Sequence, residues 1–286
     1  MVFFFGDGRL GNQLFQYAFI KSLVEKQRLI ISFNFDALLE LMESAPNLIN
    51  IRNRYVKALI RRLFVPSLHV LSKFKLISSY KVNCYLENGF ILEDATFIGS
   101  KGLLPITYIY PCFAQSENFF KESIKDDFSI NKKHLEKAKI FLSSTPQNHN
   151  IIFVHVRRGD YVEYEVLGKR GVALPVSYYR NTIKWYEENI ENPYFVFLTD
   201  DSEFVEHYFE YVQNKIVSKN SMFVDFSIIT LCEYGIMSNS SYSWWAAYLM
   251  KNRKKVFSPK YWLGWKSKLV FPSGIDPSFA EIVAVE

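Results

Sequence analysis

Residues 151–161 read Ile-Ile-Phe-Val-His-Val-Arg-Arg-Gly-Asp-Tyr, a largely apolar run, broken only by His155, that ends in charge. A continuous apolar run of this kind predicts a strand that is buried on both faces of a parallel sheet. Side chains alternate along a strand, so His155 and Arg157 belong to the same face. Parallel sheets bind ligands at the carboxyl ends of their strands, and a guanidinium there can fork onto phosphate. The simpler alternative is that Arg158 and Asp160 only pair with each other at the surface.

Helical and extended patterns alternate after this strand. We expect helices over 175–190, 202–212, 227–234 and 243–250, and strands over 194–198, 215–217, 236–237 and 255–257. Alternation of this kind is typical of a doubly wound α/β unit with a parallel sheet. Hydroxyls and free N–H groups at the start of the last helix can bind an anion, which makes Ser240 and Ser241 candidates. Ordinary N-capping by Ser241 or Ser243 is the alternative.

The amino-terminal half opens with a β-α-β pattern. A strand over 2–5 leads through Gly6-x-Gly8-x-x-Gly11 into a helix over 12–27, and a second strand follows over 29–33. This is the dinucleotide-binding fingerprint, and alone it indicates a nicotinamide- or flavin-dependent oxidoreductase. Two features weaken that interpretation. Asp36 lies 25 residues after Gly11, where about 20 is typical, and the turn carries polar side chains that a pyrophosphate does not need, those of Arg9, Asn12 and Gln13.

A polar segment over 143–148 separates the two patterns and predicts a linker. We therefore expect two Rossmann-type domains, 1–145 and 146–286, that face each other across a cleft.

The composition limits the classes of function. Net charge is +5, which allows an anionic partner without requiring one, and we expect no nucleic-acid partner. The three cysteines are far apart, and the chain has no CxxC, HExxH or Cys/His cluster, so we expect no metal site. Neither a membrane span nor a signal peptide is evident, and a reducing cytoplasm fits best. Aromatic residues reach 17%, which fits a Phe-rich core or sugar-stacking surfaces, the latter also expected of a non-catalytic carbohydrate-binding protein.

Residues 44–86 differ from the rest of the chain because they hold eight Lys or Arg and no Asp or Glu. Within them, residues 55–64 predict a basic amphipathic helix. This segment is either a solvated face or a peripheral contact with anionic lipid headgroups, or with a phosphorylated acceptor carrier, at the inner face of a membrane.

Three motifs in order carry a resemblance to a known family. They are Gly8-Arg-Leu-Gly-Asn-Gln13, His155-Val-Arg-Arg-Gly-Asp-Tyr161 and Ser238-Asn-Ser-Ser-Tyr-Ser-Trp-Trp-Ala-Ala247. Together they closely resemble glycosyltransferase family 11, the α-1,2-fucosyltransferases. The resemblance implies a GT-B-like pair of Rossmann-type domains and inverting, metal-independent transfer of fucose from GDP-fucose to O2 of a galactose-containing acceptor, with no further cofactor.

The resemblance also implies roles for individual residues. Arg157 would hold the β-phosphate, His155 would line the nucleotide pocket, and Asp225 would accept from guanine. Ser240 and Ser241 would reach the phosphates, while Asn12 and the turn that includes Gly11 would close on the donor. An acidic pair, Asp200 and Asp201, also matches these enzymes.

A catalytic base and a neutralising group complete the expected mechanism. No Asp-x-Asp occurs, so Arg157 and the helix-start N–H groups would neutralise the leaving diphosphate. Asp160 is our candidate for the base that accepts the proton of the acceptor hydroxyl. Glu163 and Glu165 are alternatives, and a mechanism without a strong base is a third possibility.

Overall fold

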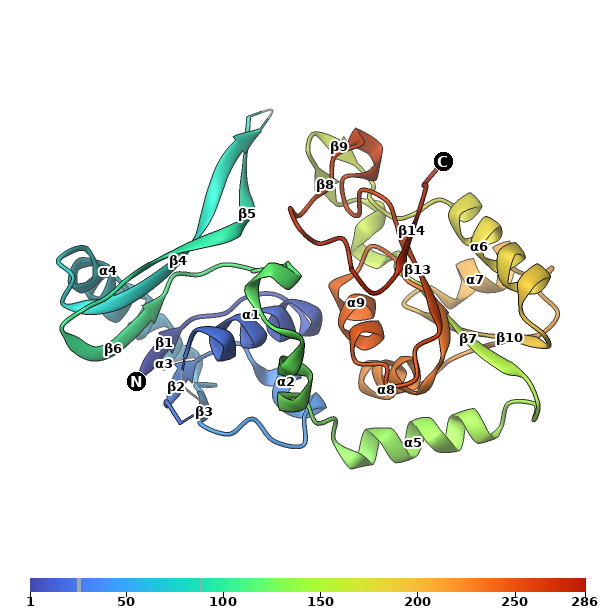
Figure 1. The fold of residues 1–286 in the computed structure, drawn as a ribbon, viewed down its shortest axis with the longest axis horizontal. Helices are drawn as coiled ribbons and strands as arrows, with labels where there is room; N and C mark the ends of the chain where they lie inside the picture. The colour runs from blue at the N-terminus through green and yellow to red at the C-terminus, as the bar shows by residue number, and fades with distance from the viewer. Residues whose placement is uncertain (25–26, 88) are drawn as a thin grey trace. The chain divides into compact units, whose positions relative to one another are not determined.

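The computed structural model describes residues 1–24, 27–87 and 89–286, and the chain forms two compact units, Met1–Asn131 and Lys132–Glu286. Each unit has its own six-stranded sheet with helices packed against it (Figure 1). This confirms the predicted α/β class. The boundary lies at residues 131 and 132, whereas the polar linker led us to place it at 145 and 146.

The sheet of the C-terminal unit is parallel throughout, in the order β11-β10-β7-β12-β13-β14. Its strands are β7 (Asn150–Val156), β10 (Pro193–Thr199), β11 (Lys215–Val217), β12 (Tyr234–Ile236), β13 (Lys255–Pro259) and β14 (Glu281–Val283). All strands of the predicted alternation are present, and β14 follows the last one that we expected. Leu198 pairs with His155 and Thr199 with Val156, so β7 and β10 end side by side.

Helices α6 (Val176–Asn189), α7 (Ser202–Tyr208), α8 (Met222–Leu231) and α9 (Ser241–Tyr248) connect these strands. One buried cluster joins the apolar side chains of β7 and β10 to Tyr178, Ile183 and Tyr186 of α6. The start of α8 differs from our expectation, which was residue 227. Seven of its ten residues are buried, and its exposed ends, Met222 and Leu231, are apolar, so it has no polar face whose periodicity could reveal where it begins.

Helix α5 (Lys132–Ser143) explains the shifted boundary. It packs against α8, with the ring of His134 stacked on Phe223 at a centroid distance of 5.2 Å. Ala138 is fully buried on the same side, whereas Ile140 on the opposite side is 70% exposed. The polar segment after α5 therefore connects two elements of one unit.

The N-terminal unit has the sheet order β3-β2-β1-β6-β4-β5. The strands are β1 (Val2–Phe4), β2 (Ile30–Ser32), β3 (Leu48–Asn50), β4 (Ile77–Glu87), β5 (Phe90–Ser100) and β6 (Leu104–Ile109), and the helices are α1 (Leu10–Leu23), α2 (Asp36–Leu41), α3 (Arg54–Leu59) and α4 (Val65–Lys73). The expected β-α-β opening is present, although part of the helix predicted over 12–27, residues 25 and 26, lies outside the described residues.

Strands β4 and β5 form a long antiparallel hairpin, of which the sequence pattern predicts only a short strand over residues 90–92 (Figure 1). Leu86, Ile91 and Ile98 are apolar but more than half exposed. The polar-out, apolar-in alternation that identifies a half-buried strand is therefore missing here.

The packing of α5 generates a prediction. Replacing Ala138 with Phe should destabilise the C-terminal unit by about 1–3 kcal/mol, because the buried site has no room for a ring. The matched change Ile140→Phe, on the exposed side of the same helix, should alter the free energy of unfolding by less than about 0.5 kcal/mol. Chemical denaturation followed by tryptophan fluorescence measures both. Equal effects would contradict the packing of α5 on α8.

Candidate active site

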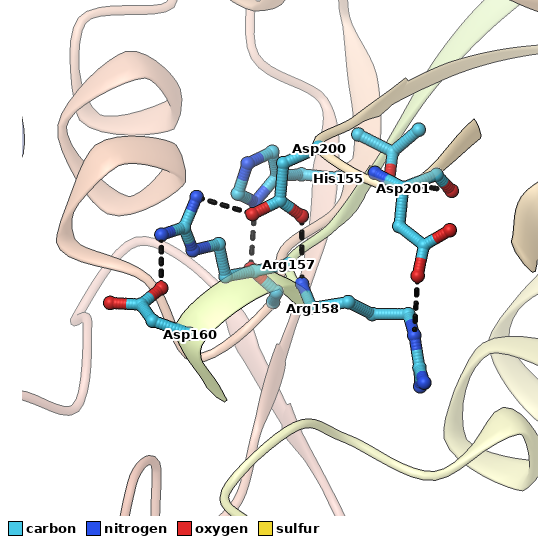
Figure 2. Close-up of polar contacts among 8 residues, drawn as sticks. His155, Arg157, Arg158, Asp160, Asp200 and Asp201 are labelled. Atoms are coloured by element: carbon cyan, nitrogen blue, oxygen red, sulfur yellow. Dashed lines mark hydrogen bonds and ion pairs between the residues drawn. The ribbon is translucent and has the colours of Figure 1, made fainter. Parts of the chain in front are cut away.

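Arg157 follows directly on β7 and lies between two carboxylates (Figure 2). Its Nη1 is 2.5 Å from Oδ2 of Asp200, which follows β10, and its Nη2 donates to Asp160 in the turn after β7. The Arg157 side chain is only 19% exposed, so water screens these ion pairs weakly. A guanidinium has five N–H groups, and these contacts leave several for a ligand. The two carboxylates orient Arg157 without saturating it.

Gly159 is required for this arrangement. A Cβ atom there would lie 2.5 Å from Oδ2 of Asp200, the same oxygen that contacts Arg157. Asp200 also accepts from the backbone N–H of Arg158 at 2.8 Å. The aspartate therefore ties the ends of β7 and β10 together, and any larger residue at 159 would displace it.

Arg158 has a structural role. Its Nε donates to Asp201 at 3.1 Å, and its guanidinium carbon lies 3.6 Å from the ring centroid of Phe204. Asp201 in turn caps α7 by accepting from the N–H of Phe204. The possibility that Arg158 pairs with Asp160 is thus wrong, because Asp160 pairs with Arg157 and Arg158 pairs with Asp201.

His155 is buried beneath Arg157 at the end of β7. Its Nδ1 is 2.7 Å from the hydroxyl of Ser238, and its ring lies 5.2 Å from that of Tyr242 on α9. Burial, together with the charge of Arg157, lowers the pKa of His155 to about 3. The imidazole is therefore neutral at physiological pH, and positive charge at this site comes from Arg157.

The turn between β12 and α9 lies beside His155. Ser240 is the N-cap residue of α9, but its side chain makes no capping hydrogen bond, and the Ser243 hydroxyl instead donates to the carbonyls of Ser238 and Ser240. Ordinary capping by Ser243 therefore does not occur. The first N–H groups of α9 have no intrahelical acceptor, which is the arrangement that binds anions. Ser241 begins the helix at the same place.

Asp225 lies in the first turn of α8 and is largely buried. The Ser218 hydroxyl donates to it at 2.5 Å. Burial raises the pKa of Asp225 from 3.8 to about 7, and the hydrogen bond from Ser218 opposes that shift. Tyr242 connects this carboxyl to the rest of the site, since it stands edge-on to Phe226 of α8 and contacts His155.

The three candidate bases have different surroundings. Asp160 has a half-exposed side chain and contacts Arg157. Glu163 pairs with Arg170 of the short β8–β9 hairpin (Glu165–Val166 and Lys169–Arg170), and both side chains are largely exposed. Glu165 is exposed in β8. Of these three described side chains, Asp160 is the one that pairs with the guanidinium of Arg157, which we expect to hold the donor.

The glycine turn belongs to the N-terminal unit, where two glutamines of α1 hold it. Gln13 donates to the carbonyl of Gly8 and accepts from the N–H of Leu38, while Gln16 donates to the carbonyls of Asp7 and Cys112. Gly8 has a φ of 90°, and a Cβ there would lie 2.4 Å from the Asn12 side chain.

Asn12 is positioned by Gln115, whose Nε2 donates to its Oδ1 at 2.7 Å, and Gly11 is buried in the first turn of α1. Asp36 begins α2, beyond the end of β2, and pairs with Arg52 at 3.0 Å. It is thus not placed like the strand-end acid that a dinucleotide ribose requires.

Sequence reasoning missed two contacts that organise the site. We noted Asp200 only as part of an acidic pair, but it is the link between Arg157 and β10. Asn239 is fully buried, and its Nδ2 donates to the Val172 carbonyl at 2.7 Å, which fixes the serine-rich turn. The only signal in the sequence was that Asp200 and Asn239 are polar residues that follow predicted strands.

The described residues lack two further features. Among residues 1–24, 27–87 and 89–286, no group of three or more His, Cys, Asp or Glu side chains is placed to hold a metal ion. Within the same ranges, no helix has the length and apolar character that crossing a bilayer requires.

The surroundings of Asp225 predict a pH dependence of stability. Its pKa is raised on folding, so between about pH 4 and 7 the folded protein holds a proton that the unfolded chain releases, and stability falls as pH rises. The wild type should lose on the order of 4 kcal/mol relative to Asp225→Asn across this window. Denaturation of the C-terminal unit from pH 4 to 8 measures the difference. Glu206→Gln, on the exposed side of α7, is the control, and a pH-independent difference for Asp225→Asn would contradict the raised pKa of Asp225.

Comparison with known proteins identifies relatives over most of the chain. An O-antigen biosynthesis glycosyltransferase of Escherichia coli, WbnK, is 28% identical and aligns with 94% of this chain and 98% of its own length. An alpha-1,2-colitosyltransferase of Escherichia coli is 28% identical over 85% of each chain. Galactoside alpha-(1,2)-fucosyltransferase 2 of Pongo pygmaeus is 24% identical over 85% of this chain and 67% of its own.

Solved structures show the fold. The fucosyltransferase NodZ from Bradyrhizobium has a TM-score of 0.54 at 11% identity, over 89% of this chain and 94% of its own. A family 9 glycosyl transferase from Veillonella parvula has a TM-score of 0.51 at 12% identity, over 99% and 86%. The predicted GT-B-like fold is confirmed. The model of the family described as Glycosyl transferase family 11 matches residues 2–262, a span that contains all three motifs, and the chain belongs to this family.

Proposed function

We propose that this glycosyltransferase moves L-fucose from GDP-fucose to O2 of a galactose-containing acceptor, with inversion at the anomeric carbon and without a metal ion. The observation that carries this proposal is Arg157, held by Asp160 and Asp200 at the end of a central strand whose His155 contacts Ser238 and Tyr242 at the start of α9. Both features suit a diphosphate. Family membership sets aside the oxidoreductase and the non-catalytic carbohydrate-binding protein as alternatives.

The relatives support the donor and the linkage. Two of them are described as α-1,2-transferases, one of fucose and one of colitose, and the NodZ structure has been determined with GDP-fucose. Colitose is fucose without its C3 hydroxyl, so the same diphosphate and base contacts would serve either donor. Fucose is our choice, and the test below includes the other sugar.

The reaction we propose is a single displacement. The acceptor O2 forms a bond to the anomeric carbon while the bond from that carbon to the β-phosphate oxygen breaks, and the electron pair leaves with GDP. Arg157 and the first N–H groups of α9 would stabilise the charge that develops on the diphosphate. His155 is neutral and would line the pocket, Ser240 and Ser241 would contact the phosphates, and the Asp225 carboxylate would accept from guanine N1 and N2.

Three further residues complete the proposal. Asp160 would accept the proton of the acceptor hydroxyl. Asn12 and Gly11, in the glycine turn of the N-terminal unit, would contact the donor.

The experiment that tests the donor, the acceptor and metal independence is a transfer assay in the presence of EDTA. Metal-stripped protein is incubated with GDP-fucose and lactose or N-acetyllactosamine, and GDP release and product mass are measured. We expect a product that has gained one fucose, linked through O2. GDP release without product would contradict the acceptor, activity with GDP-colitose alone would contradict the donor sugar, and activity restored only by a divalent ion would contradict metal independence.

The two carboxylates on Arg157 predict different kinetic defects. If Asp160 is the base, Asp160→Asn should lower kcat by about 10²–10⁴-fold and change GDP affinity much less than kcat, because the amide oxygen can still accept from Arg157. Asp200→Asn should weaken GDP binding as well, because Asp200 positions Arg157 and the end of β10. Glu188→Gln, which removes only an exposed pair on α6, is the control. Near-normal turnover of Asp160→Asn together with loss in Glu165→Gln would show that our assignment of the base is wrong.

A further inference from the structure

A continuous helical segment of the N-terminal unit, formed by α3, a π-helical turn (Ile60–Phe64) and α4, is apolar on two opposite faces. On the inner face, Leu68 is buried, and Ile60 and Leu71 pack against the core around Phe3 and Tyr108. On the outer face lie five apolar side chains, each more than half exposed: Tyr55, Leu59, Leu63, Val70 and Phe74. Their spacings of four, four, seven and four residues place them along one side of the helix.

A second segment extends this outer face. The backbone N–H of Leu103 donates to the carbonyl of Lys75, and that of Leu104 donates to the carbonyl of Leu76. Leu103 is 84% exposed, the largest value among the exposed apolar side chains of the described residues. The outer stripe and residues 103–104 therefore form one surface, which we call the outer helical face.

Positive charge surrounds the outer helical face. Arg62, Lys73, Lys75 and Lys101 are exposed. Within the described ranges, none of these four forms an ion pair with a carboxylate. The stretch from 44 to 86 also contains no Asp or Glu that could neutralise them.

We propose that the outer helical face binds the surface of an anionic lipid bilayer. An interfacial helix places leucine and aromatic side chains among the headgroups and lysine or arginine along its borders, which is the distribution found here. Anionic headgroups would supply the negatively charged partners that Lys73, Lys75 and Lys101 do not have among the described residues. A uniformly basic border favours a lipid surface over a protein partner, whose matching face would have to carry unpaired acidic residues. The proposed membrane contact is thus one side of the helical segment together with residues 101–104, and not the whole basic segment 44–86. It does not depend on the proposed sugar donor.

The test is vesicle flotation with the full chain. Vesicles of phosphatidylcholine alone are compared with vesicles that also contain phosphatidylglycerol, at low and at high salt. We expect binding to the anionic vesicles at low salt and weaker binding at high salt, because counterions screen the basic border. The Lys73→Gln, Lys75→Gln, Lys101→Gln triple variant should lose affinity for the anionic vesicles by about fivefold per removed charge.

Apolar variants separate insertion from simple charge attraction. The Leu59→Ser, Leu63→Ser, Phe74→Ser triple variant should keep its preference for anionic vesicles at low salt but lose the binding that survives at high salt. Ile140→Ser on α5 and Lys184→Gln on α6 are matched controls, since each removes an exposed side chain of the same kind from the other unit. Both controls should float like the wild type.

Three results would overturn the inference. The first is no flotation with anionic vesicles at low salt. The second is equal flotation of the wild type and both triple variants. The third is a concentration-dependent dimer in sedimentation analysis that the apolar variant abolishes, which would assign the face to a second copy of the chain. Transfer to a soluble acceptor should be unchanged in both triple variants, so failure of the proposed transfer reaction would be distinguishable from failure of membrane binding.

Discussion

The pairing of Arg157 with Asp160 and Asp200 is the interaction on which the rest of the site depends. A guanidinium at the end of a buried strand has lost most of its water, and carboxylates on two sides fix its plane and compensate that loss. Arg157, Asp160 and Asp200 together carry one positive and two negative charges. A diphosphate would therefore bind here only with help from other donors, and the first N–H groups of α9, beside His155, can supply it.

Several features of the C-terminal unit serve this arrangement. The register of β7 with β10 brings Asp200 level with Arg157, and Gly159 leaves room for the carboxylate between them. Burial keeps His155 neutral, so that it does not repel the guanidinium beside it. These features come from segments that are distant in sequence, and the parallel topology makes them neighbours because it aligns the carboxyl ends of the strands.

The sequence predicted the strands of the C-terminal unit well because β7 and β10 are mainly apolar runs followed by polar residues. The sequence did not predict elements that lack a regular alternation of apolar buried and polar exposed side chains. The start of α8 lay outside our prediction because both of its sides are buried, and the β4–β5 hairpin because its exposed side chains are apolar. The shifted unit boundary depended on α5 packing against α8, a contact between distant segments that no local pattern contains. Asp200 was recognisable as polar at a strand end, but its contact with Arg157 depends on strand register, which was not predicted.

The most direct test of the diphosphate site compares the affinities for GDP and for guanosine, measured by calorimetry with EDTA present, in the wild type and in Arg157→Ala. If Arg157 holds the diphosphate, the variant should lose about ten- to a hundredfold in GDP affinity, as expected for a hydrogen bond to a charged group, while guanosine affinity stays unchanged. If the variant keeps the wild-type ratio of GDP to guanosine affinity, Arg157 does not bind the diphosphate, and the central assignment of this site is wrong.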